Sequence, residues 1–218
     1  MPKLPKQLGA TSKRLAQNTK PWDRPPLSGG GDKDSTTIYT AVGKALSAWE
    51  KLELEFAGLF DCLVGINLDS HASHRAYGVV TTSQIRRDML KAASEAYFSE
   101  FPFSSLQKRV NQAIKASEQF STRRNEIAHG IVAKNYNKPN DLAVEGEKSD
   151  DYWNLVPAMT STKKVKLNSW GGDFTPEYAF TAKEINDFAS GFWSLANDVA
   201  LLIQEVRQRR CEYEELSG

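Results

Sequence analysis

Apolar residues recur at helical spacing in four long stretches of the chain. In each stretch they fall on one side of a 3.6-residue wheel, as in a helix that buries one face. The stretches are about 36–63, 83–98, 106–133 and 182–212. The pattern predicts a mainly α protein, a helical bundle of four or five helices.

Local signals refine these helices. Asp34 or Ser35 is placed to cap the first helix, and Thr181 with Glu184 matches a capping box before the last. Residues 65–78 are predicted to form a loop. The inward face of the second helix is predicted to consist of Ile85, Met89, Ala92 and Ala96.

The character of the chain changes at about residues 135–180. Prolines and glycines interrupt short β-branched or alternating runs at 152–156 and 164–167. We expect a small β-hairpin, or three short strands, inserted before the C-terminal helix. The insertion also holds Lys163, Lys164 and Lys166 near Tyr152, Trp153 and Trp170. These residues fit either a surface for single-stranded nucleic acid or solvated strand edges that carry lysine.

Residues 1–34 are predicted to form a flexible basic arm that precedes a helical domain over 35–218. The arm contains five prolines and a glycine triplet, and its seven basic residues outnumber three acidic ones. Such an arm fits nonspecific binding of RNA, and it equally fits a solvated tail without function. Within it, Trp22 suggests docking onto another surface.

The composition is that of an ordinary globular protein, with 218 residues, 40% apolar residues and a net charge of +1. No apolar run is long enough to cross a membrane, and no apolar segment of a secretory signal follows the basic N-terminus, so we expect a cytoplasmic protein. Cys62 and Cys211 match no disulfide or metal spacing. Asp69, His71 and His74 allow a metal site, but a solvent-facing loop is the commoner reading.

The candidate chemistry lies late in the third stretch, where the sequence reads Arg-Arg-Asn-Glu-Ile-Ala-His-Gly from Arg123 to Gly130. Asn125 and His129 are one helical turn apart on the same flank. Arg124 projects ~100° away from Asn125, in line with the apolar stripe. A guanidinium there needs a carboxylate, a phosphate or a solvated cleft. In the structural alternative, Arg124 pairs with a buried acid and His129 is a hydrogen-bonded core residue.

The segment Arg124 to His129 resembles the Arg-x4-6-His signature of the HEPN superfamily (higher eukaryotes and prokaryotes nucleotide-binding domains), in which the residue after the arginine is typically Asn, Asp or His. The resemblance implies an all-helical bundle that forms a homodimer. It also implies metal-independent cleavage of RNA, often as a toxin or phage-defence effector with an antitoxin or regulatory protein as partner. No cofactor is expected.

The functional prediction is therefore a metal-independent endoribonuclease that works through Arg124, Asn125 and His129 at a dimer cleft. A histidine can exchange a proton with the ribose 2′-hydroxyl or the leaving 5′-oxygen, an arginine can bind the phosphate, and the asparagine can orient either. Arg123 and Lys134 flank the motif and are predicted to contact nucleic acid. Two alternatives stay open: a non-catalytic HEPN-like module that binds a nucleotide or partner protein, and a nucleic-acid-binding adaptor that uses the basic arm.

Overall fold

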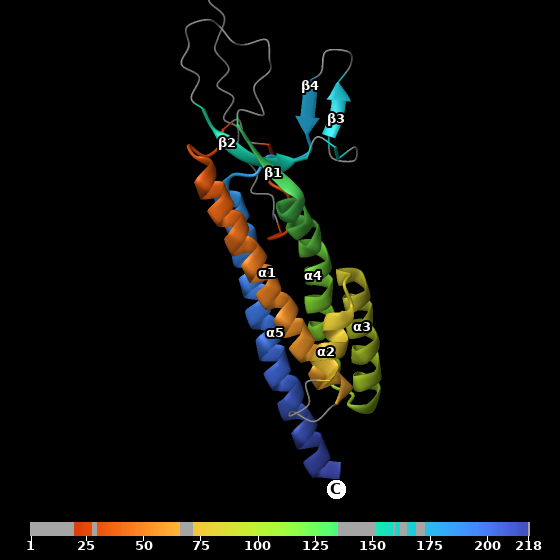
Figure 1. Ribbon diagram of the computed structural model, residues 1–218. Coiled ribbons are helices and arrows are strands. Elements are labelled where there is room, and N and C mark those ends of the chain that lie inside the picture. The colour runs from red at the N-terminus through yellow and green to blue at the C-terminus, as the bar shows by residue number, and fades with distance from the viewer. Residues whose placement is uncertain are drawn as a thin grey trace, which may run out of the picture.

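The computed structural model describes residues 20–27, 30–65, 72–134, 151–158, 160–161, 165–168 and 173–217. Within them the chain forms five helices and four strands (Figure 1). The helices are α1 (Ser35–Val64), α2 (Ala72–Val79), α3 (Ser83–Glu100), α4 (Ser104–His129) and α5 (Ala182–Ser217). The strands are β1 (Gly130–Lys134), β2 (Trp153–Pro157), β3 (Val165–Asn168) and β4 (Asp173–Pro176). The predicted fold class, a mainly helical bundle with a β insertion before the C-terminal helix, is confirmed.

The three long helices α1, α4 and α5 form the centre of the bundle, and α4 runs opposite to the other two (Figure 1). An aromatic cluster joins them. The ring of Phe192 on α5 lies 5.3 Å from Trp49 on α1 and 5.3 Å from Phe120 on α4, edge-on in both pairs. Edge-to-face aromatic pairs of this kind add to the stability that burial alone provides.

The strands lie at one end of the bundle (Figure 1). β1 continues directly from α4 and pairs antiparallel with β2, with Ile131 opposite Val156. β3 and β4 form a second antiparallel pair. Single bridges join Leu155 to Phe180 and Asp32 to Trp153, so this end of the bundle is tied to segments distant in the sequence.

Two predictions about elements are corrected. The helix predicted over about 106–133, which is α4, does not reach residue 133, because Gly130–Lys134 pairs with β2 as a strand. Residues 72–78 of the predicted 65–78 loop belong to helix α2, whereas Asp69 and His71 lie outside the described residues. Within 135–180 the described residues form three strands, β2, β3 and β4, as in the three-strand alternative, and β2 pairs with β1, the strand that precedes the insertion.

The predicted inward face of α3 is wrong at Ile85, Ala92 and Ala96, which are exposed, whereas Met89 packs against the core. Ile85 is 52% exposed, and the side chains that α3 buries include Leu90, Tyr97 and Phe98. The large rings of Tyr97 and Phe98 bury more apolar area than the alanines on the predicted face, so packing selects their side of the helix.

The described part of the N-terminal segment packs against the bundle. Trp22 meets Phe120 edge-on at 5.5 Å between ring centroids, as its apolar character suggested. The carboxylate of Asp32 accepts a hydrogen bond from the backbone N–H of Ala182 at 2.7 Å, at the start of α5. Residues 20–27 and 30–34 therefore belong to the folded domain, where the sequence had indicated an arm.

None of the helices in the described ranges combines the length and the apolar character needed to span a lipid bilayer.

Candidate active site at the end of helix α4

Helix α4 ends at His129 because the chain turns directly into β1. Gly130 has extended backbone angles, φ −77° and ψ 160°. A Cβ atom at Gly130 would lie 2.8 Å from Cγ of Leu155 and 3.0 Å from the carbonyl oxygen of Glu126. Glycine is therefore required here by the close approach of β2, and this contact fixes the last helical turn against the hairpin.

A buried ionic network holds the inner side of that turn. The Glu126 side chain is fully buried, and its carboxylate lies 2.6 Å from Nη2 of Arg24 and 2.7 Å from Nη1 of Arg123. Nη1 of Arg24 also reaches the Glu177 carboxylate at 2.8 Å. The four charges balance, as a buried ionic cluster requires.

Burial and ion pairing act differently on the two arginines. Burial lowers the pKa of Arg123, and the charge of Glu126 reverses only part of that effect. For Arg24, burial alone would lower the pKa, but hydrogen bonds to Glu126 and Glu177 outweigh it and the pKa is raised. The network therefore favours the charged form most strongly at Arg24.

The burial of Arg123 corrects a prediction. The sequence placed Arg123 on the solvent-facing side of α4, available to nucleic acid, but the residue is only 9% exposed. The predicted pairing of an arginine with a buried acid does occur, at Arg123 and Arg24 rather than at Arg124. Lys134, the other predicted nucleic-acid contact, is exposed and forms an ion pair with Asp151 at 2.8 Å.

Arg124 lies at the rim of the bundle. Its side chain is 30% exposed, and Nη2 is 3.9 Å from the carboxylate of Glu50 on α1, too far for a hydrogen bond. Nη1 donates to Oδ1 of Asn125 at 3.3 Å. The Nε atom is buried and has no hydrogen-bond partner among the described residues. Nη2 therefore retains N–H groups from which an anion could accept hydrogen bonds, whereas Nε is enclosed.

Asn125 and His129 face a hollow of about 620 Å³ at the junction of α4 with the β insertion. Its other walls are Pro157, Ala158, Thr160, Ser161 and Tyr178. The Tyr178 hydroxyl donates to the Glu126 carbonyl at 3.1 Å, and burial raises the pKa of this phenol. The hollow thus brings an imidazole, an amide and three hydroxyl-bearing residues, Thr160, Ser161 and Tyr178, to one cavity.

The three predicted residues lie one after another along this rim and do not all face the same cavity. Arg124 contacts Asn125, and Asn125 shares the hollow with His129, but Arg124 does not line the hollow. Sequence reasoning missed Thr160, Ser161 and Tyr178, since nothing in their local spacing marks them. Only the return of the chain from the β insertion to α5 brings them to the end of α4.

No group of three or more His, Cys, Asp or Glu residues within the described ranges is arranged to hold a metal ion. Comparison with protein-family models, with curated proteins and with solved structures found no match.

Proposed function

We propose that the protein is a HEPN-like endoribonuclease that cleaves RNA without a metal ion, with Arg124, Asn125 and His129 as its reacting set. The observation that carries the proposal is the contact of the Arg124 guanidinium with Asn125, which shares a hollow with His129. A phosphate-binding cation, an orienting amide and a proton-transfer group thus follow one another along one rim of the molecule.

In the proposed reaction, the ribose 2′-oxygen bonds to phosphorus as the bond from phosphorus to the 5′-oxygen breaks. His129 takes the proton of the 2′-hydroxyl or delivers one to the departing 5′-oxygen. Arg124 stabilises the negative charge that grows on the phosphate, and Asn125 orients the phosphate or the imidazole. The products are a 2′,3′-cyclic phosphate and a 5′-hydroxyl, and DNA, which lacks the 2′-hydroxyl, is not cut.

A homodimer belongs to this proposal. Arg124 and His129 are ~140° apart around one helix, so a single copy directs them to different parts of the surface. A second copy facing the same rim would offer its own Arg124 and His129 to the same phosphate. By the same resemblance, the biological role is that of a toxin or phage-defence effector with a regulatory protein partner.

The test is a denaturing-gel assay of purified protein on total RNA and tRNA in EDTA, with Arg124→Ala and His129→Ala beside the wild type. Arg75→Ala, an exposed arginine on α2, is the matched control. We expect the wild type and the control to cut, and the two motif variants to lose at least about a hundredfold in rate, as for removal of a general acid–base group. Equal cutting by all four proteins, or cutting that needs added magnesium, contradicts the proposal.

The alternative is a non-catalytic module that binds a nucleotide at the same hollow. It is favoured by the absence of Arg124 from the lining of that hollow. Intact RNA after long incubation, together with saturable nucleotide binding that Asn125→Ala weakens, would select this alternative.

A further inference from the structure

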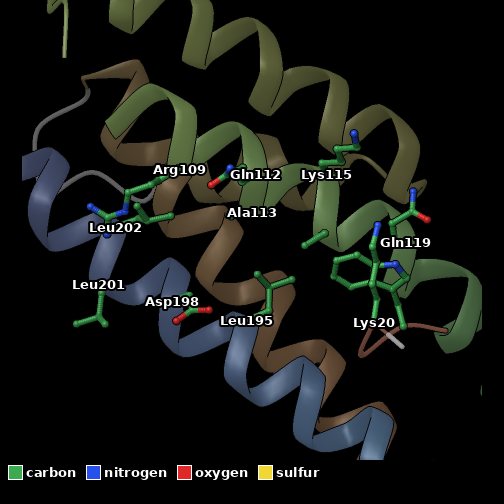
Figure 2. A pocket seen from close by; sticks show the side chains of 12 residues that line it. Lys20, Arg109, Gln112, Ala113, Lys115, Gln119, Leu195, Asp198, Leu201 and Leu202 are labelled. Atoms are coloured by element: carbon green, nitrogen blue, oxygen red, sulfur yellow. The ribbon is translucent and has the colours of Figure 1, made fainter. Parts of the chain in front are cut away.

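A second, larger hollow of about 750 Å³ lies along the groove between α4 and α5, away from the predicted motif (Figure 2). Arg109 and Leu202 mark one end of it, and Lys20 and Gln119 mark the other. The groove runs along α4 from Arg109 to Gln119. These residues are ten positions apart, which corresponds to ~15 Å at the rise of an α-helix. This length fits about three turns of another helix.

The floor of the groove is apolar. Ala113, Leu195 and Leu202 lie at its base, each less than a tenth exposed. Leu201 lines the groove with 58% of its surface exposed, so it offers an apolar contact to a partner. Small alanines on α4 leave room for inserted side chains, so the floor accepts apolar residues at helical spacing.

The rim is predominantly basic. Lys20, Arg109 and Lys115 line it, and Lys115 makes no ion pair within the described part of the chain. Arg109 is paired with Glu205 of α5, and Asp198 is the acidic residue of the lining. Because Arg109 is already paired, the charges that face a partner are Lys20 and Lys115 against Asp198, a small positive excess. Together with the apolar floor they match a helix that carries leucine-like residues on one face and carboxylates beside them.

We propose that this groove docks an acidic amphipathic helix of a partner protein. Two other occupants fit the surface less well. Residues 1–19 contain four basic residues and no acidic ones, so they would repel the rim. A single RNA strand would meet Asp198, aliphatic side chains and one aromatic ring, that of Trp22, which Lys20 already covers at 5.7 Å. Such strands bind by stacking successive bases on several aromatic side chains.

The test uses fluorescence anisotropy with the full-length protein and a labelled synthetic helix of about four turns, with leucines on one face and glutamates flanking them. A matched peptide carries lysine at every glutamate. A peptide of residues 1–19 and a single-stranded oligoribonucleotide serve as the competing probes. We expect saturable binding of the acidic peptide and at least about tenfold weaker binding of the lysine peptide.

Two variants locate the binding. Leu201→Ser should weaken binding of the acidic peptide about tenfold, because the substitution removes an apolar contact. Lys115→Glu should weaken binding of the same peptide about fivefold, as expected for the loss of an exposed charge pair. Both side chains are exposed, so neither change disturbs the core. Trp193→Ser is the matched control, since Trp193 is an exposed apolar residue of α5 that lines a different hollow.

The absence of saturable binding overturns the proposal, as does equal binding of the acidic and lysine peptides. Tighter binding of the 1–19 peptide would assign the groove to the chain's own N-terminus, and tighter binding of RNA would assign it to nucleic acid. Binding that neither Leu201→Ser nor Lys115→Glu weakens would place the peptide elsewhere and also reject the assignment.

Discussion

Replacing Glu126 with glutamine tests the buried ionic network at the end of α4. The substitution keeps the size of the side chain but removes the charge on which Arg24 and Arg123 converge at 2.6 and 2.7 Å. Removing one partner of a buried ion pair costs about 3–5 kcal/mol, because the remaining charge is left uncompensated. Arg24 keeps Glu177 and is a quarter exposed, so we expect the lower end, about 3 kcal/mol.

Urea unfolding followed by far-ultraviolet circular dichroism measures this free energy of unfolding. The slope of the free energy of unfolding against urea concentration (the m value) should be unchanged, since the surface exposed on unfolding is the same. In a thermal melt, a loss of this size lowers Tm by roughly 6–12 °C for a domain of this length.

The control is Glu177→Gln, which removes the second carboxylate of the same Arg24. Because the Glu177 side chain is 44% exposed, water compensates for its loss and the expected cost is below about 1 kcal/mol. If Glu126→Gln proves as mild as Glu177→Gln, the carboxylate at 126 is not the centre of the network and the reasoning fails.

Three further predictions concern single residues. Gly130→Ala should destabilise the fold by about 1–3 kcal/mol in urea unfolding, because its Cβ would lie 2.8 Å from Cγ of Leu155. Burial raises the pKa of Tyr97 to about 12, and its hydroxyl donates to the Val206 carbonyl. The protonated Tyr97 hydroxyl thus contributes fully to the free energy of unfolding below pH ~10, and this contribution is lost as the pH rises towards 12. Tm measured against pH should therefore fall in this range, and it should fall less in Tyr97→Phe. Hydrogen bonds from Thr37 hold the pKa of Asp34 below its usual value, so Asp34→Asn should lower Tm at neutral pH but not well below pH ~4.

Helical periodicity was enough to predict the bundle, because α1 buries a stripe along its length and α5 buries one from Ala182 to Val206. It failed at α3, which packs on one side through a few large residues such as Tyr97 and Phe98. It also failed at β1, where Gly130–Lys134 continues the apolar pattern of α4 but pairs with β2. Strand pairing across the insertion is a long-range interaction that no local pattern contains.

The candidate site was predictable only along α4. Asn125 and His129 share a surface because they are one turn apart on a single helix, which the sequence states directly. The walls of their hollow come from Pro157 to Tyr178, and these residues reach α4 only through the packing of the insertion. Their contribution could therefore not be read from spacing.

The different environments of Arg123 and Arg124 follow from a partner distant in the sequence. Neighbouring residues on a helix point ~100° apart, so only one of the two arginines can reach Glu126 from the inner face. Arg24 lies 102 positions before Glu126 in the chain and is the second cation that pairs with the Glu126 carboxylate. Because Arg24 and Arg123 together with Glu126 and Glu177 are electrically balanced, the cluster needs no charge from Arg124. Arg124 is thereby left at the rim, where Nη1 donates to Oδ1 of Asn125 and Nη2 lies 3.9 Å from the Glu50 carboxylate, so the phosphate-binding role that we propose for it competes with no buried ion pair.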